Sequence, residues 1–432
     1  MTKGEINRLG DKIRKEYPNV EEETLSLLED YRKSYKDSLA SIFNLLCRLK
    51  SQVGVNTIIT YRIKRFESII NKLDRFPKMQ FSRMWDIGGC RCIVGNNMQV
   101  YKLKKLIEKN LIIRKENDYI ENPQEDGYES LHLYVSLPND NNIIELQIRN
   151  QDNHNWATLV EISDLLYDAG IKEYGKNKEL YKFHQLLSKD MEDITYEEKV
   201  TIALIIKKYN YINKLSEVFT RNHLNVREQW FNIESEGANK YFLIQASKNK
   251  IPIIKAFSSF SEAENEYFET YQKNQKSNII LTHLQRPNYH HISVAYSNYI
   301  LTMHSFEEDS ANIYGDLVIQ SLQKGSYRTF FQYYNTYHDI MLNRLGNSFR
   351  EILFARKVSL GAENNKSKLN KKKKEWTKDI KAELEKCTRS MNTFSNKIKY
   401  HIPKNGINRI CILGMVKYIL WIHKQKIRKM LK

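Results

Sequence analysis

Two short runs in which apolar and polar residues alternate constrain the fold more than any other feature of the chain. In the run from Ile143 to Arg149, every second residue is polar, namely Glu145, Gln147 and Arg149. The run from Ser130 to Val135 repeats the alternation with Ser130, His132 and Tyr134. Because alternate side chains of a strand share one face, both runs predict strands with one apolar face and one polar face.

The surrounding segments predict a mixed sheet flanked by helices, which is an α+β fold. We expect an amphipathic N-terminal helix from Glu21 to Arg48 and a second, basic helix from Lys64 to Leu73, because apolar residues recur there at helical spacing. Period-two patterns and short apolar runs then predict strands at Ile87 to Val94, Ile112 to Lys115, Leu131 to Leu137 and Ile143 to Ile148. A helix from Met98 to Lys109 is expected between the first two strands.

The second half of the chain predicts a further small α+β domain and a helical, basic tail. The expected elements of that domain are strands at Trp230 to Glu234, Tyr241 to Ala246, Ile279 to His283 and Ile292 to Ile300, with a helix from Ser261 to Gln272. Aromatic helices should follow from Ser310 to Lys357, and Asn364 to Lys374 has the composition of a solvated linker or a helix start. The predicted domains are residues 1–55 (helices), 56–190 (mixed sheet), 191–305 (small α+β, regulatory), 306–360 (aromatic helices) and 361–432 (basic linker and tail).

Charge and cysteine content restrict the partners and the compartment. The 69 Lys and Arg exceed the 51 Asp and Glu and leave a formal charge of +18, which favours polyphosphates, RNA, the ribosome or an acidic membrane surface as partners. The five scattered cysteines form no CxxC cluster, so we expect a cytoplasmic protein. The apolar run from Ile410 to Ile422 is shorter than the roughly 20 residues of a membrane-spanning helix, and predicts a packed helix, with peripheral membrane contact as the alternative.

Acidic and basic residues upstream of the alternating runs indicate a nucleotide-phosphate site. Asp86 precedes Gly88 and Gly89, which permit close backbone approach. Asp86 and Glu145 together could hold Mg²⁺, which in such sites takes one or two carboxylates together with phosphate oxygens. The basic segment from Tyr61 to Lys72 could gather cations for phosphate at a helix N-terminus. The alternative for the sheet is an amphipathic face turned to solvent.

Ordered motifs make this segment resemble the synthetase domain of the RelA/SpoT family of alarmone synthetases. The resemblance extends from about Glu21 to Tyr167. The matching motifs are Arg62-x-Lys64-x-x-x-Ser68-x-x-x-Lys72, Asp86-Ile87-x-Gly89-x-Arg91, Asp118-Tyr119-Ile120 with Pro123, Gly127-Tyr128-x-Ser130-Leu131-His132, Glu145-x-Gln147-Ile148-Arg149 and His154-x-Trp156-Ala157.

The resemblance implies an ATP-dependent pyrophosphotransferase of the GTP pyrophosphokinase type with Mg²⁺ as cofactor. It implies that the β,γ-pyrophosphate of ATP moves to the 3′-hydroxyl of GDP or GTP, making (p)ppGpp, with Glu145 accepting the hydroxyl proton. The implied roles are catalysis for Glu145, Asp86 and Lys64; metal binding for Asp86 and Glu145; ATP binding for Arg62, Lys64, Ser68, Lys72 and Arg91; and acceptor binding for Tyr128, His132, Gln147 and Arg149.

Departures from the family pattern leave other functions open. Glu129 stands where a basic or amide residue is common, and Val160-Glu161 stands where Glu-His is common. The alternatives are pyrophosphorylation of the tRNA 3′ end by a toxin that blocks translation, and a non-catalytic module that binds nucleotide or RNA. His338-Asp339 lacks the further ligands of a hydrolase metal site, and His283, His290, His291 and His304 predict structural roles. The sequence leaves a homo-oligomer open.

Overall fold

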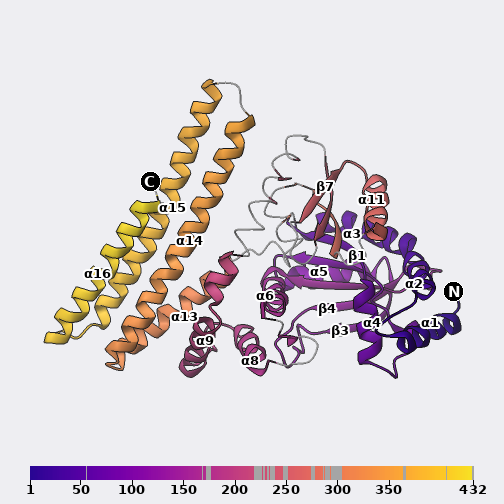
Figure 1. Ribbon diagram of the computed structural model, residues 1–432, viewed down its shortest axis with the longest axis horizontal. Helices are drawn as coiled ribbons and strands as arrows, with labels where there is room; N and C mark the ends of the chain where they lie inside the picture. The colour runs from indigo at the N-terminus through magenta and orange to yellow at the C-terminus, as the bar shows by residue number, and fades with distance from the viewer. Residues whose placement is uncertain are drawn as a thin grey trace. The chain divides into compact units, whose positions relative to one another are not determined.

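The computed structural model divides the chain into two compact units (Figure 1). Unit 1 comprises Met1–Ile162 and Asn225–Leu301, and unit 2 comprises Ser163–Leu224 and Thr302–Lys432. The structure describes residues 1–54, 56–167, 169–171, 177–217, 226, 229–230, 233, 239–246, 252–273, 278–285, 287, 292, 304–362, 366–404 and 406–430.

Unit 1 is built on one mixed β-sheet, so the α+β class predicted from the sequence is confirmed. Among the described residues the sheet has eight strands in the order β3-β4-β5-β2-β1-β8-β6-β7. Strands β2 and β5 are parallel, and the other pairs are antiparallel. The strands are β1 (Ile58–Ile63), β2 (Gly88–Val94), β3 (Ile112–Asp118), β4 (Leu131–Ser136), β5 (Ile144–Asn150), β6 (Tyr241–Ala246), β7 (Ile253–Phe257) and β8 (Asn278–His283).

Helices cover one apolar face of this sheet. They include α1 (Lys3–Glu16), α2 (Glu22–Lys33), α3 (Lys36–Val53), α4 (Phe66–Arg75), the short η1 (Phe81–Arg83), α5 (Asn97–Glu108) and α11 (Phe260–Lys273), while α6 (Gln151–Tyr167) runs across the boundary between the units. The helix predicted from Glu21 to Arg48 is two helices, because the chain turns at Ser34, whose hydroxyl donates to the carbonyl of Tyr31 at 2.6 Å. Leu39 and Phe43 of α3 and Leu103 of α5 join Cys90 and Leu146 of the sheet in one buried cluster.

The predicted second sheet is wrong: its strands extend the first sheet. Strand β8 pairs with β1, with Ile59 opposite His283 and Tyr61 opposite Leu281. Sequence analysis missed β1 because five of its six residues are buried, so its pattern lacks the alternation that marks a half-exposed strand. The strands predicted at residues 230–234 and 292–300 lie mostly outside the described residues, and Trp230, Ile233 and Ile292 are helical.

Unit 2 is helical. Its elements include α8 (Lys178–Leu187), α9 (Tyr196–Lys208), α13 (His304–Gln323), α14 (Tyr327–Ala362), α15 (Lys366–His401) and α16 (Ile407–Met430). Within the segment predicted as a linker or helix start, residues 366–374 form the beginning of α15, and residues 364 and 365 lie outside the described residues. Side chains from α13, α14, α15 and α16 share one buried cluster, which includes Val318, Phe330, Ile398 and Val416. In the described part of the chain, no helix is long and apolar enough to cross a membrane.

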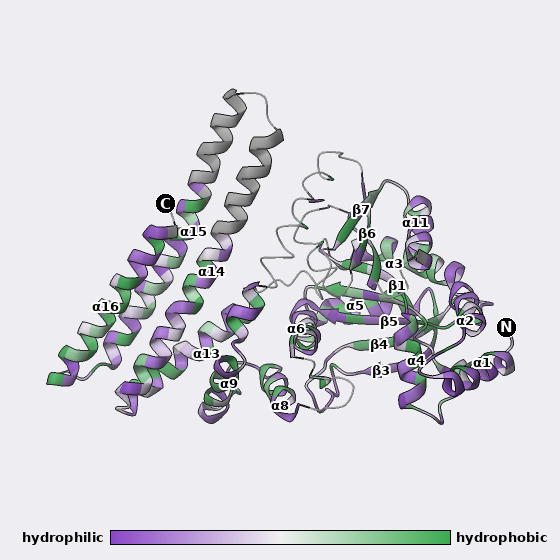
Figure 2. Ribbon diagram, viewed as in Figure 1, coloured by the Kyte–Doolittle hydropathy of each residue, from purple (hydrophilic) through white to green (hydrophobic). Residues whose placement is uncertain are grey.

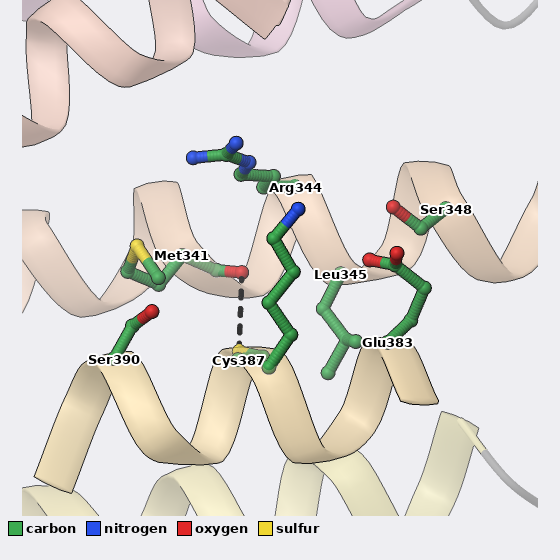
Figure 3. Close-up of a pocket in the computed structure, with 8 residues that line it drawn as sticks. Met341, Arg344, Leu345, Ser348, Glu383, Cys387 and Ser390 are labelled. Atoms are coloured by element: carbon green, nitrogen blue, oxygen red, sulfur yellow. Dashed lines mark hydrogen bonds between the residues drawn. The ribbon is translucent and has the colours of Figure 1, made fainter. Parts of the chain in front are cut away.

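A small cavity lies between α14 and α15 (Figure 3). Its volume is about 40 Å³, and Met341, Arg344 and Glu383 contribute to its lining. The thiol of Cys387 donates to the carbonyl of Met341 at 3.9 Å across one side of it. A space of this size admits water and excludes a nucleotide. His338, also on α14, is buried against Tyr334, with ring centroids 4.4 Å apart, and no group of three metal-binding side chains occurs among the described residues.

Candidate active site

The strand register brings the predicted polar residues together on one face of unit 1. One row of paired residues crosses four strands through Arg62, Gly89, Glu145 and Tyr134. The adjacent row crosses the same strands through Thr60, Arg91, Gln147 and His132. Because paired residues in register share a face, the two rows form a polar surface of cations, carboxylate, amide and imidazole.

Gly89 leaves this surface open between Arg62 and Glu145. A Cβ atom at Gly89 would lie 3.2 Å from the carbonyl oxygen of Glu145, which is closer than most real Cβ contacts. Its neighbour Gly88 faces the opposite side, where a Cβ would lie 3.0 Å from Ile144 and 3.3 Å from Tyr35. The two glycines therefore have different structural roles. Gly88 permits close helix packing on one face of the sheet, and Gly89 leaves space on the polar face.

Two lysines converge on one oxygen of Asp86, beside this space. The ammonium of Lys64 lies 2.8 Å from Oδ2 of Asp86, and that of Lys72 lies 2.9 Å from the same atom. Burial alone would raise the pKa of Asp86, but the two lysines hold it well below the ordinary value. Burial lowers the pKa of Lys64, which Asp86 partly offsets. The other oxygen, Oδ1 of Asp86, is buried and has no hydrogen-bond partner among the described residues.

A hollow at the end of α4 adjoins this cation pair. Its volume is about 730 Å³, and Lys72, Arg75 and Lys78 supply three of the side chains that line it. A space of this size accommodates part of a nucleotide, and its lining combines these three cations with the apolar side chains of Phe76, Pro77 and Met79. Ser68 lies one turn before Lys72 on α4 and makes no side-chain hydrogen bond to the residues of the site.

Glu145 lies at the centre of a hydrogen-bond network and is only 7% exposed. Its Oε1 lies 3.3 Å from Nδ1 of His132 and accepts from the hydroxyl of Tyr134 at 3.2 Å, and its Oε2 accepts from Gln147 at 3.1 Å. Burial alone would raise the pKa of Glu145, but His132 lowers it below the ordinary value. Glu145 is therefore an ionised carboxylate at neutral pH.

Tyr128 extends the network beyond His132. Its hydroxyl lies 2.9 Å from Nε2 of His132. Burial alone would raise the pKa of Tyr128, but Arg149 and His132 lower it to about 8. Burial opposes protonation of His132, but the contacts with Glu145 and Tyr128 raise its pKa. The turn before Tyr128 requires Gly127, whose φ of 88° is disfavoured for other residues.

The backbone at the end of β1 is held from two sides, by residues that sequence analysis did not assign to the site. The N–H of Ile63 donates to the hydroxyl of Tyr267 on α11 at 2.8 Å. The side chain of Arg32 donates to the carbonyl of Lys64 at 3.0 Å and lies between the rings of Phe66 and Tyr271, at 4.1 and 4.0 Å. These contacts fix the segment that carries Lys64.

Tyr134 is a further residue that was not assigned to the site, although its position on the polar face follows from the alternation. The two departures from the family pattern also lie at the site. Glu129 accepts from Asn153 at 3.0 Å. Burial and the neighbouring Arg149 and Arg62 lower the pKa of Arg91, and Glu161 opposes this shift. Glu161 thus supplies negative charge near Arg91.

Comparison with known proteins matches the segment that forms this site. The family model described as the region found in RelA / SpoT proteins matches residues 61–172, which include all the predicted site residues. GTP pyrophosphokinase YwaC of Bacillus subtilis is 31% identical over 156 residues, which are 31% of this chain and 74% of that protein.

Two further relatives match a similar share of this chain. A guanosine-3′,5′-bis(diphosphate) 3′-pyrophosphohydrolase of Borreliella burgdorferi is 31% identical over 140 residues, 32% of this chain and 20% of that protein. The crystal structure of small alarmone synthetase 2 of Bacillus subtilis has 30% identity and a TM-score of 0.26, covering 35% of this chain and 79% of that one. The chain thus spans only a fifth of the Borreliella protein but three quarters of YwaC.

Proposed function

This chain belongs to the RelA/SpoT family, and we propose that it transfers the β,γ-pyrophosphate of ATP to the 3′-hydroxyl of GDP or GTP, making (p)ppGpp. The observation that carries the proposal is a pair of buried carboxylates: Asp86, which holds two lysines, and the ionised Glu145, which interacts electrostatically with Asp86. The name of YwaC, a GTP pyrophosphokinase, supports the same reaction.

ATP binds along β1, β2 and α4 in this proposal. Arg62 and Arg91 are diagonal neighbours on the polar face, so their guanidinium groups can lie on the two sides of the adenine ring. Lys64, which precedes α4, and Ser68 and Lys72, which lie one turn apart on α4, contact the phosphates. The three cations that line the hollow offset the charge of the phosphate chain.

The donor set fits Mg²⁺. The partnerless Oδ1 of Asp86 is a hard, buried oxygen, and Mg²⁺ at nucleotide sites takes one or two carboxylates together with phosphate oxygens. Asp86 and Glu145 would hold the ion. Both oxygens of Glu145 already accept hydrogen bonds, so Asp86 offers the first ligand and Glu145 has to exchange a partner. Bound Mg²⁺ would stabilise negative charge on the transferred group.

The acceptor nucleotide binds over β4 and β5. Tyr128 stacks on the guanine base, while His132, Gln147 and Arg149 position the ribose and phosphates. Glu145 accepts the proton of the 3′-hydroxyl. The hydroxyl oxygen then forms a bond to the β-phosphorus of ATP, the bond from that phosphorus to the α–β bridging oxygen breaks, and AMP leaves with the electron pair. Lys64 and Lys72 offset the charge that develops on the phosphates.

Label transfer from ATP tests the proposal. Full-length protein is incubated with γ-labelled ATP and Mg²⁺, and with GDP, GTP or deacylated tRNA in separate reactions. We expect label in a guanine nucleotide that carries a 3′-pyrophosphate, together with AMP. Label in tRNA alone would show that the acceptor is the tRNA 3′ end and not GDP or GTP. Label in none of the acceptors would favour a non-catalytic binding module.

A further inference from the structure

Helix α16 has two apolar faces, and within the described part of unit 2 one of them is buried while the other is exposed. Ile412, Val416 and Ile427 are buried, and the first two join the cluster shared with α13, α14 and α15. The other face carries five large exposed apolar side chains: Ile407 (78% exposed), Ile410 (72%), Met415 (42%), Tyr418 (60%) and Trp421 (57%). Figure 2 shows hydrophobic and hydrophilic residues interspersed along the whole length of α16.

The exposed residues form one continuous strip. At about 100° per residue, Ile407, Ile410, Tyr418 and Trp421 fall on the same side of the helix, opposite the buried Val416. The rings of Tyr418 and Trp421 are stacked, with centroids 6.2 Å apart. We call these four side chains, together with Met415, the outer strip. A contiguous exposed apolar surface of this kind marks an interaction site.

The charge around the outer strip has one sign. Between Ile407 and Met430 the chain has six Lys and Arg and no Asp or Glu. Lys417, Lys424 and Arg428 are exposed and, by the same helical geometry, lie along one edge of the strip. On the other edge, Lys426 forms an ion pair with Asp339 of α14 at 3.2 Å. The complementary partner is therefore apolar at its centre and negatively charged around it.

We propose that the outer strip docks on the surface of an anionic lipid bilayer, with α16 lying in the plane of the membrane. Tyr and Trp favour the boundary between hydrocarbon and water, and the lysines can extend their charged ends to lipid phosphates. A second copy of this chain fits less well, because its lysines would face these lysines. RNA fits less well, because Ile407, Ile410 and Met415 cannot stack with bases as aromatic rings do.

Vesicle binding by the full-length protein tests this proposal, which does not depend on the proposed pyrophosphate transfer. We expect co-sedimentation with vesicles of phosphatidylcholine mixed with phosphatidylglycerol, weaker binding to phosphatidylcholine alone, and loss of the difference at high salt. The double variant Ile410→Ser/Trp421→Ser should weaken binding at least about tenfold. Met98→Ser is the matched control, because Met98 is a 79% exposed apolar residue on α5, and it should leave binding unchanged.

A charge variant keeps the test decisive if the apolar variant alters the fold. Lys417→Glu/Lys424→Glu should lower binding to anionic vesicles at least about tenfold and leave the melting temperature near that of the parent. Equal binding to neutral and anionic vesicles, or binding that neither double variant changes, would overturn the proposal. The proposal would also be overturned if, in the absence of vesicles, the variants abolished dimerisation or tRNA binding. The outer strip would then bind a second copy of the chain or RNA.

Discussion

The ammonium of Lys64 lies 2.8 Å from Oδ2 of Asp86, and this pair joins the residue that follows β1 to the segment just before β2. Lys72 reaches the same oxygen from α4, so a single atom receives two cations. The second oxygen of Asp86 is left buried without a partner. This arrangement provides phosphate-binding cations and a free carboxylate oxygen within one cluster.

Replacing Asp86 by Asn should reduce pyrophosphate transfer at least about a hundredfold, because the amide offers no anionic ligand and leaves two lysines unpaired. Asp74→Asn is the matched control and should keep parental rates, because Asp74 is an exposed carboxylate on α4, the helix that carries Lys72. Initial rates at several Mg²⁺ concentrations measure the effect. Asp86→Asn with parental rates and parental Mg²⁺ dependence would contradict the assignment.

The same variant should change stability in acid. The pKa of Asp86 is lowered in the folded chain, so its contribution to stability is present above the ordinary pKa of an aspartate, about 3.9, and is lost as pH falls toward the lowered value. Asp86→Asn should therefore flatten the decline in stability below about pH 4. Denaturant unfolding at several pH values measures this. A parental decline in Asp86→Asn would show that the ion pairs contribute little.

Tyr134→Phe should lower the rate of transfer several-fold with little change in the KM for ATP. The substitution removes the hydroxyl that donates to Oε1 of Glu145 at 3.2 Å, so the carboxylate loses one contact that orients it. Steady-state kinetics separate kcat from KM. A rise in KM for ATP at unchanged kcat would mean that Tyr134 acts on donor binding instead.

Tyr128 should titrate near pH 8. Arg149 and His132 lower its pKa to about 8 against its burial, whereas an ordinary tyrosine titrates near 10. Because the folded pKa is depressed, the contribution of Tyr128 to stability grows as pH rises from about 8 to about 10. NMR of ring-labelled tyrosine, assigned with Tyr128→Phe, measures the pKa. His132→Gln should raise the pKa of Tyr128. If that pKa does not change, groups other than His132 cause the whole of its lowering.

Tyr267→Phe should raise the KM for ATP by roughly threefold to tenfold, as expected from losing one buried hydrogen bond. The hydroxyl of Tyr267 accepts from the N–H of Ile63, next to Lys64. Tyr271→Phe on the same helix is a matched control, because the hydroxyl of Tyr271 is buried without a partner and its ring stays against Arg32. If the two variants behave alike, the hydroxyl of Tyr267 does not position Lys64.

Excision of residues 241–283 tests whether this segment is an independent domain. The N–H of Leu284 donates to the carbonyl of Lys240 at 2.9 Å, so the two ends can be joined directly. We expect the shortened chain to lose cooperative unfolding, because β1 loses its partner β8 and Arg32 loses the ring of Tyr271. A shortened chain that melts at the parental temperature and retains transfer would support a small domain that folds separately, as the sequence predicts for residues 191–305.

The polar face can be predicted from the sequence because the pattern that defines it lies within short continuous segments of the chain. The alternation from Ile143 to Arg149 fixes which side chains share a face, and β5 forms where that pattern lies. The pairing of Ile59 with His283 joins residues far apart in the chain, and no local pattern reveals it. The contact between Ile63 and Tyr267 is hidden for the same reason. The sequence also does not distinguish the roles of the neighbouring Gly88 and Gly89, because these roles depend on what packs against each residue in the folded chain.

The central claim is that Glu145 and the lysine pair on Asp86 act together to transfer pyrophosphate from ATP. Parent protein and Glu145→Gln are each given γ-labelled ATP, Mg²⁺ and GDP, and AMP and 3′-labelled guanine nucleotide are quantified together. We predict equal amounts of the two products from the parent and a loss of at least about a hundredfold in Glu145→Gln, with the melting temperature retained. ATP consumption that yields ADP and phosphate, or equal transfer by both proteins, would contradict the account.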